Sequence, residues 1–307
     1  MTWSAVAAVV MLFVIAPLVP GIAAKTKARL AGRRGAPVLQ LYWDLSRLWR
    51  KGAVYSRTTT WVFRVAPVAL VATAGAATCL VPLDGARAIL SFSGDFVAFA
   101  YLLALGRFLL VLAALDTGSS FEGMGASREV TVAAFAEPAL FLAFVAVVVA
   151  SGETSLSGAL GAALAGAWPT AAPALAMVAV SLFLVLLAEG SRVPVDDPAT
   201  HLELTMIHEV MVLDHSGQDL ALVLYGSALK LSLFAALLVG VVAPRAALPP
   251  LVALPALVAG IVVAAVAIGI VESVTARLRL GRVPQFLTAA SALAALGVIL
   301  LLAGSGT

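Results

Sequence analysis

Long apolar segments restrict the fold of this chain more than any other feature of its sequence. A hydrocarbon core of about 30 Å is crossed by about 20 helical residues, and several apolar runs reach that length. Only 11% of the residues are charged, whereas soluble domains average about 25%. Eight spans are predicted, over approximately Trp3–Ala24, Trp61–Leu83, Asp95–Leu115, Val130–Ala150, Ala171–Ala188, Leu220–Ala243, Leu251–Val271 and Gln285–Ala303.

The spans leave no segment long enough for a separate soluble domain. We therefore expect an all-α polytopic membrane protein in which residues 1–307 form one membrane domain. The first apolar segment does not resemble a signal peptide, because no basic residue precedes it and its first charge is Lys25. The single cysteine, Cys79, lies inside a predicted span, which argues against a disulfide framework or a cysteine metal site.

Lys and Arg are distributed unevenly between the two sets of loops. With the N-terminus outside, the inside loops are 25–60, 116–129, 189–219 and 272–284. They carry fourteen Lys and Arg, whereas the outside loops carry only Arg87 and Arg245. Because cytoplasmic loops are enriched in Lys and Arg, the sequence predicts a membrane protein with its N-terminus outside. The net charge of +3 reflects this membrane face and does not indicate nucleic-acid binding.

The first inside loop contains an amphipathic segment at about residues 37–51. One helical stripe is apolar and is formed by Val38, Leu41, Tyr42, Leu45, Leu48 and Trp49. A helix of this length is too short to span a bilayer, and its Trp and Arg content is typical of a helix lying in the membrane interface. Such a helix either packs only against the spans or also helps to hold a cytoplasmic partner.

The inside loop at 189–219 is strongly acidic, with seven Asp or Glu residues and all three histidines of the chain. Asp197 followed by Pro198 is typical of a helix N-cap, and Thr200 with Glu203 forms a possible capping box. We therefore expect a short helix that continues to about Leu213. Acid clusters held between membrane spans favour a functional role.

The three histidines of this loop recur every seven residues, at His201, His208 and His215. Two helical turns separate neighbouring rings by roughly 10 Å, which is too far for one small ion. The zinc-protease pattern needs its second histidine four residues after the first, and His208 lacks that partner. A metal site is therefore not expected; the rings are solvated, face a partner or relay protons.

Ionisable side chains also lie within or at the edges of the predicted spans. Arg107 and Lys230 fall near the middle of their spans, where facing lipid would cost roughly 2.5–3.5 kcal/mol each. Glu137 precedes Pro138, which leaves a nearby backbone carbonyl without its helical donor, and Glu189 closes the fifth span. Two interpretations remain open: ion pairs that hold the bundle together, or titratable groups that carry protons.

Several motifs together resemble a known family. They read LDTGSSFEGMGASRE at 115–129, AEP at 136–138, AEGSRVPVD at 188–196, DDPATHLEL at 196–204 and HEVM at 208–211. They are similar to the membrane subunit that joins the two arms of respiratory complex I. The similarity is closer to its relatives in energy-converting NiFe hydrogenases, of the formate hydrogenlyase subunit 4 and hydrogenase-4 type.

The resemblance implies an anchor and coupling subunit in the cytoplasmic membrane of a prokaryote, in a complex that links electron transfer to proton translocation. No cofactor is expected in this chain, whereas Fe–S clusters and a NiFe centre are expected on partner subunits. The implied partners are hydrogenase-like large and small subunits, a ferredoxin-like Fe–S subunit, antiporter-like membrane subunits and the lipid bilayer.

Some positions depart from the quinone-using branch of the family. Val195 stands where that branch tends to have an aromatic residue, and Ala199 and His201 stand where it has acids. A quinone site is therefore less expected here. The alternatives are the quinone-site subunit of complex I and a stand-alone ion or proton transporter, which an inverted internal repeat would favour.

The candidate site residues form two groups. Proton movement and coupling are assigned to Glu137, Glu189, Lys230, Arg107, Asp116 and Glu129. Docking of a partner by the acidic loop is assigned to Arg192, Asp196, Asp197, His201, Glu203, His208, Glu209 and Asp214. Neither group includes a catalytic or metal-binding residue.

Overall fold

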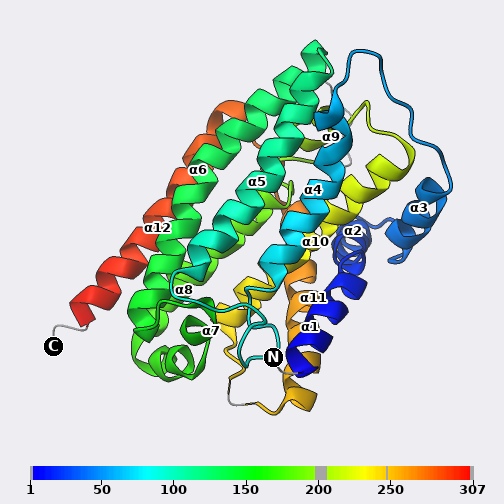
Figure 1. Ribbon diagram of the computed structural model, residues 1–307. Coiled ribbons are helices and arrows are strands. Elements are labelled where there is room, and N and C mark those ends of the chain that lie inside the picture. The colour runs from blue at the N-terminus through cyan, green and yellow to red at the C-terminus, as the bar shows by residue number, and fades with distance from the viewer. Residues whose placement is uncertain (1–2, 198–205, 247, 305–307) are drawn as a thin grey trace.

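The computed structural model describes residues 3–197, 206–246 and 248–304, and its described elements are all helical (Figure 1). The helices are α1 (Trp3–Ile15), α2 (Leu18–Leu30), α3 (Gln40–Trp49), α4 (Trp61–Thr78), α5 (Asp95–Asp116), α6 (Ser120–Ser151), α7 (Leu156–Ala159), α8 (Ala162–Glu189), α9 (His208–Met211), α10 (Gly217–Val242), α11 (Pro250–Val274), η1 (Leu280–Arg282) and α12 (Val283–Gly304). The end of the bundle that carries the loops 25–60, 116–129, 189–219 and 272–284 is called the basic end below.

The chain is a multi-pass membrane protein. Seven described helices are long and apolar enough to cross a bilayer, and α1 with α2 makes up to eight when the bent pair counts as one span. The first predicted span is not continuous, because α1 and α2 meet at an angle of 46°. Pro17 stands at the break and Pro20 in the first turn of α2, and proline cannot complete the helical hydrogen-bond pattern.

Two helices extend well beyond the predicted spans. Helix α6 begins at Ser120 and has 32 residues, which gives a length of about 48 Å at 1.5 Å per residue. Its first turns therefore project from a hydrocarbon core of about 30 Å at the basic end. Helix α8 begins at Ala162 and is kinked at Ala171, which lies between Pro169 and Pro173.

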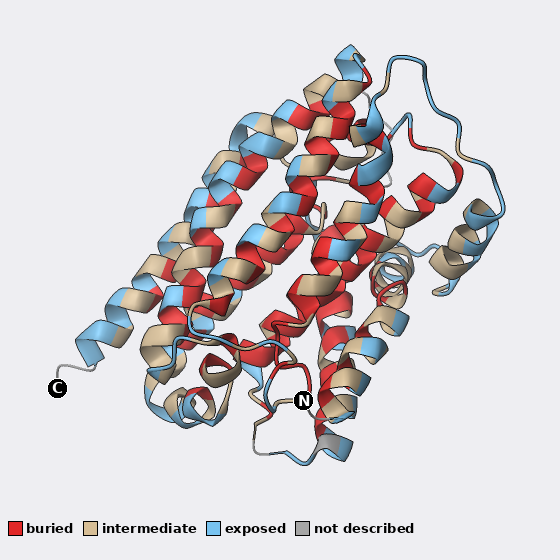
Figure 2. Ribbon diagram, viewed as in Figure 1, coloured by how far each residue is buried: buried red, intermediate tan, exposed pale blue. Residues whose placement is uncertain are grey.

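Helix α10 lies at the centre of the bundle. In the most apolar 18-residue stretch of α10, 67% of the residues are buried, compared with 22% in the last span, which ends in α12. Figure 2 shows the burial along the inner helices. Hydrogen bonds fix α10 to distant helices: Tyr225 donates its hydroxyl to the carbonyl of Phe13 in α1 at 2.9 Å. The sequence therefore places polar groups that must be buried, including Lys230, on the most enclosed helix.

The amphipathic segment forms α3, which is shorter than the predicted range of 37–51 and contains no buried residue. Its stripe faces the bundle through Tyr42, whose hydroxyl donates to the carbonyl of Val14. Gln218 donates its side-chain amide to the carbonyl of Trp49 at 3.4 Å, which ties the end of α3 to the start of α10. Trp43 and Trp49 remain half exposed, as an interfacial helix requires.

The helix predicted from Pro198 to about Leu213 is wrong in its described part. Met206 and Ile207 are not helical, and α9 is a short helix over His208–Met211. Residues 198–205, and with them the proposed capping box, lie outside the described residues. The backbone amides of Ile207 and His208 donate to Oδ2 of Asp196 at 3.3 and 3.0 Å. The carboxylate of Asp196, which is not part of the predicted cap, therefore accepts the free backbone amides at the beginning of α9.

Gly217, at the start of α10, allows a close approach of two backbone segments. Its φ is +52°, and a Cβ there would lie 2.4 Å from the carbonyl oxygen of Gly52. We predict that Gly217→Ala lowers the thermal unfolding midpoint in detergent, because it adds a steric clash to a left-handed backbone strain of about 1–2 kcal/mol. Gly118→Ala is the matched control, since Gly118 has φ +71° but no atom within 4 Å. Equal losses in the two variants would contradict the clash.

Candidate functional site

Four charged side chains from four helices meet inside the bundle and form the buried ion cluster: Arg107, Glu137, Glu189 and Lys230. One guanidinium nitrogen of Arg107 donates to Oε1 of Glu189 at 2.6 Å, and the other donates to Oε1 of Glu137. Lys230 donates to Oε2 of Glu189 at 3.0 Å. The ion pairs considered in the sequence analysis are therefore present, with Glu189 at their centre.

The cluster neutralises charges that burial would otherwise make costly. Its two cations and two anions balance, and each buried member has a partner of opposite sign. The side chain of Glu189 is 7% exposed, whereas that of Glu137 is 40% exposed. Removing one partner of a buried pair leaves the other charge uncompensated, which commonly costs about 3–5 kcal/mol. Glu189 is thus both a structural contact and the most enclosed carboxylate of the cluster.

A cavity of about 340 Å³ reaches this cluster from the basic end. Its walls come from α2, α3 and α10, and its inner part is lined by Arg107, Glu129, Glu189 and Lys230. Further polar residues on its walls are Gln40, Asp44, Ser191, Arg192, His208, Glu209 and Ser227. Most of the cavity wall is nevertheless apolar, and these polar groups form the minority of its lining.

His208 belongs to the acidic loop and lines the cavity. Its ring Nε2 is 3.0 Å from the hydroxyl of Ser227, and its backbone amide donates to Asp196. Burial, and then the nearby charge of Lys230, lowers the pKa of His208 to about 4. The ring is therefore neutral near pH 7 and connects the loop to α10 by a hydrogen bond without adding charge to the cavity.

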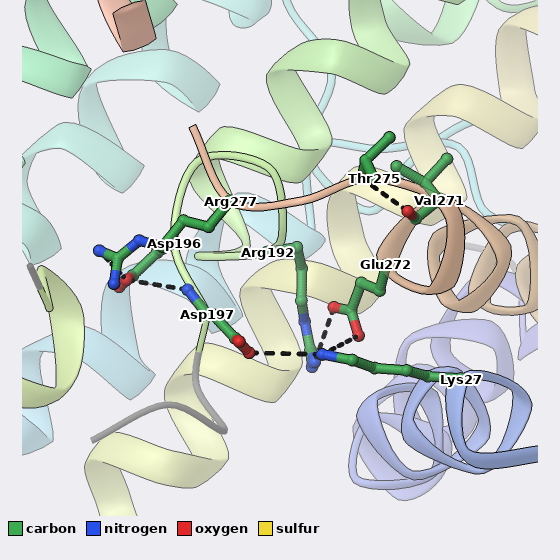
Figure 3. Close-up of polar contacts among 8 residues, drawn as sticks. All are labelled: Lys27, Arg192, Asp196, Asp197, Val271, Glu272, Thr275 and Arg277. Atoms are coloured by element: carbon green, nitrogen blue, oxygen red, sulfur yellow. Dashed lines mark hydrogen bonds and ion pairs between the residues drawn. The ribbon is translucent and has the colours of Figure 1, made fainter. Parts of the chain in front are cut away.

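A second set of charges, here called the loop anchor, fixes the acidic loop to α2, to the end of α11 and to the segment that follows α11 (Figure 3). Lys27 contacts Asp197 at 3.4 Å and Glu272 at 3.8 Å. Arg192 contacts Glu272 at 3.5 Å, and Arg277 donates to Asp196 at 3.0 Å. Three separate parts of the chain are thereby held together at the basic end.

The loop anchor changes how two predicted docking residues are interpreted. Asp196 is 3% exposed and is occupied by Arg277 and by two backbone amides, and the side chain of Asp197 is 16% exposed beside Lys27. Asp196 therefore directs its charge to Arg277 within the chain, and its assignment to partner docking stays a prediction. Arg192, predicted as a docking residue, also lies inside the anchor, with its guanidinium turned toward Glu272.

The other predicted residues fall in different places. Glu129 and Glu209 line the cavity. Asp116 is apart from the buried cluster: its Oδ2 accepts from the backbone amide of Thr60 at 2.6 Å and joins α4 to α5. Asp214 is exposed, and its backbone amide donates to Glu122 at 3.2 Å. His201 and Glu203 lie outside the described residues.

Four residues of these arrangements were not singled out from the sequence: Lys27, Ser227, Glu272 and Arg277. Glu272 had a usable signal, because it is the one acid between 251 and 284 and it stands at the end of a span. Lys27 and Arg277 were counted only as part of the positive face. Ser227 had no signal of its own, since a serine in a membrane helix commonly bonds its own backbone.

The comparisons with known proteins agree with this architecture. A family model described as NADH dehydrogenase matches residues 3–303. The chain is 30% identical to formate hydrogenlyase subunit 4 of Escherichia coli, over 95% of this chain and 96% of that protein. It is 31% identical to hydrogenase-4 component C of the same organism, over 78% and 75%. A subunit of the NADH-quinone oxidoreductase of Rubrobacter xylanophilus is 27% identical over 62% and 57%.

A solved structure has the same fold. A chain of the membrane-bound sulfane sulfur reductase, an archaeal respiratory membrane complex, superposes with a TM-score of 0.84, covering 97% of this chain and 98% of that one at 19% identity. Fold, buried charges and relatives together define a membrane subunit of an oxidoreductase complex. The chain belongs to the NADH dehydrogenase family, and it is homologous to the formate hydrogenlyase and hydrogenase-4 membrane subunits.

The loop anchor leads to a stability prediction. Asp196→Ala removes the charge partner of Arg277 and the acceptor of two backbone amides, and we expect a loss of about 3–5 kcal/mol from the broken buried pair. The loop should also become more sensitive to limited proteolysis. Asp214→Ala is the control, because exposed positions usually change stability by less than about 0.5 kcal/mol. Similar melting of both variants in detergent would show that the anchor does not stabilise the fold.

Proposed function

We propose that this chain is the membrane anchor and coupling subunit of a hydrogenase-type complex, similar to formate hydrogenlyase, in the cytoplasmic membrane of a prokaryote. It docks a peripheral arm at the basic end and links electron transfer on that arm to proton translocation. The observation that carries the proposal is a buried ion cluster at the inner end of a cavity whose wall also contains polar side chains of the acidic loop.

The cluster is suited to proton transfer because Glu189 is shared by two cations. Arg107 and Lys230 contact different oxygens of its carboxylate. A carboxylate that loses a nearby cation binds a proton more readily, and one that regains the cation releases it. Small movements of Lys230 or Arg107 would therefore load and unload Glu189, with Glu129 in the cavity and Glu137 at the outer edge of the cluster as its neighbours.

A continuous series of contacts connects the basic end to this carboxylate. Arg277 pairs with Asp196, which accepts from the amide of His208, whose ring bonds Ser227. Ser227 lies one helical turn before Lys230 on α10. A displacement of the acidic loop by a docked partner would therefore move the region of α10 that carries the cation of the cluster. Coupling by such a route needs a two-state element that both ends bias, and the loop has that role here.

The redox chemistry is assigned to partner subunits. The single cysteine of this chain, Cys79, is far short of the thiolate ligands that Fe–S clusters need. The proposed partners are hydrogenase-like large and small subunits with Fe–S clusters and a NiFe centre, a ferredoxin-like subunit and antiporter-like membrane subunits. The names of the curated relatives, formate hydrogenlyase subunit 4 and hydrogenase-4 component C, support this choice.

Conservative replacement of the cluster carboxylates tests the proton role. Glu189→Gln and Glu137→Gln keep size and shape but remove the titratable group, so the complex should assemble, and proton translocation per electron should fall at least several-fold. Proton uptake into vesicles containing the purified complex, followed with a pH-sensitive dye during redox turnover, is the measurement. Glu153→Gln is the control, because Glu153 is exposed at the opposite end. Parent-like translocation in both cluster variants would make these carboxylates structural only.

Orientation is tested separately with single cysteines in a Cys79→Ser background. Cysteines replacing Arg33 and Gln218 at the basic end should be protected from an impermeant thiol reagent in intact cells. Cysteines replacing Arg87 and Glu153, which are exposed at the opposite end, should react, because the positive-inside rule places the basic end in the cytoplasm. The reverse labelling pattern would exclude a docked cytoplasmic arm.

A further inference from the structure

Three helices that contribute to the buried ion cluster also contribute aromatic side chains that meet inside the bundle. These side chains, here called the aromatic layer, are Phe99 of α5, Phe144 of α6 and Phe234 of α10. Their exposed fractions are 0, 3 and 2% in that order. Phe99 meets Phe144 edge-on at a centroid separation of 5.8 Å and meets Phe234 in the same way at 6.2 Å. Because these are the separations of rings in contact, the three side chains form one contiguous apolar layer.

The aromatic layer lies on one side of the ion cluster, toward the end of the bundle opposite the basic end, here called the outer end. Helix α5 begins at the outer end, whereas α6 and α10 run toward it. Phe234 follows Lys230 by four residues, which is about 6 Å along α10, and Phe144 follows Glu137 by seven residues, about 10 Å along α6. Phe99 stands eight residues before the arginine of the cluster, about 12 Å along α5.

Buried charged residues are present again on the far side of the layer. Asp95 is 0% exposed, and its Oδ1 accepts from the backbone amide of Leu156 at 2.6 Å. It precedes Phe99 by four residues, which is about one helical turn. Asp84 and Arg245, in the loops that follow α4 and α10, are also buried. The aromatic layer therefore separates two regions of the interior that contain ionisable side chains.

Two hollows approach the layer from opposite ends, and neither includes its rings. The cavity of about 340 Å³ has the ion cluster at its inner end, and the three phenylalanines are not among the described residues of its wall. A groove of about 480 Å³ at the outer end is lined by loop residues, including Arg87, Glu153 and Ala246, and by none of the three rings. Closely packed apolar side chains leave no room for water. The rings thus offer a proton neither water nor a titratable group.

We propose that the aromatic layer is a proton barrier that isolates the buried ion cluster from the outer end of the protein. This inference rests on the proposed function, because only a cluster that exchanges protons needs such isolation. A charge in an apolar medium is strongly disfavoured, and hydrophobic constrictions close membrane pathways by excluding water. Phenylalanine suits this role because its ring fills space without a polar atom. The membrane therefore stays tight to protons at this subunit while Glu189 is loaded and unloaded.

Replacing two rings of the layer by serine tests the barrier in the absence of redox turnover. The complex carrying Phe99→Ser and Phe234→Ser is reconstituted into vesicles, and a pH gradient is imposed while potassium and valinomycin clamp the membrane potential. Passive proton influx, followed with a pH-sensitive dye, should rise at least about tenfold over the parent, because the smaller hydroxyl side chains admit water. Phe99→Leu with Phe234→Leu keeps the layer apolar and should stay within about twofold of the parent.

The matched control is the pair Phe108→Ser and Phe135→Ser. These side chains are 56 and 38% exposed on α5 and α6, so they lie outside the aromatic layer. This variant has the same change in composition and should admit protons at the parental rate. An equal leak in both serine variants would mean that the bundle has loosened in general, and would overturn the inference. A parental rate in an assembled layer variant would overturn it as well.

Thiol labelling decides the result if the serine variant of the layer does not assemble. In a Cys79→Ser background, Phe234→Cys places a thiol in the layer and Leu224→Cys places one in the cavity wall on the same helix. A small membrane-permeant maleimide reacts with the thiolate, which burial in apolar surroundings disfavours. Leu224→Cys should therefore react at least about tenfold faster than Phe234→Cys. Equal reactivity would show that water enters the layer, which contradicts a barrier there.

The barrier and the proposed function fail in different ways. If Glu189→Gln abolishes coupled translocation while the serine variant of the layer stays tight, only the barrier is wrong. If the serine variant leaks while Glu189→Gln translocates like the parent, the layer is confirmed as a barrier of the bundle, and the proton role of the cluster is wrong.

Discussion

The attraction between Glu189 and two cations is the interaction on which the interior of this protein depends. Charges buried in a membrane bundle are tolerated only where each finds a partner, and Arg107 and Lys230 meet that need from α5 and α10. The cluster fixes four spans relative to one another, and a cavity reaches it. The contacts that stabilise the bundle are therefore also the groups that could exchange protons.

The acidic loop illustrates a division between composition and surface. Its carboxylates act mainly within the chain: Asp196 starts α9 and holds Arg277, and Asp197 meets Lys27. These contacts place His208 against α10, where its ring meets the hydroxyl of Ser227. Among the described residues of the loop, most acids are therefore engaged inside the molecule, and Asp214 is the exposed one.

Periodicity and hydropathy predicted the helical spans and the amphipathic α3, because both depend on local sequence. The pairing of Arg107 and Lys230 with acids could also be anticipated, since unpaired charges are costly inside a membrane. The ion-pair partners in distant loops could not be anticipated, because no local sequence feature indicates that Glu272 contacts Lys27 and Arg192. The break between α1 and α2 was missed because a hydropathy profile does not register the effect of two prolines on helix geometry. The start of α9 was missed because it is capped by Asp196, which lies eleven and twelve residues before the amides that it accepts from.

The contact between Gly217 and Gly52 also limits how related chains can differ. Two backbones touch there without an intervening side chain, so the segment 50–60 between α3 and α4 rests directly on the first turn of α10. An added residue in the segment 50–60 would lift the chain from its support or shift its register against Ser216. The number of residues between α3 and α4, more than their identity, is the property that this contact constrains.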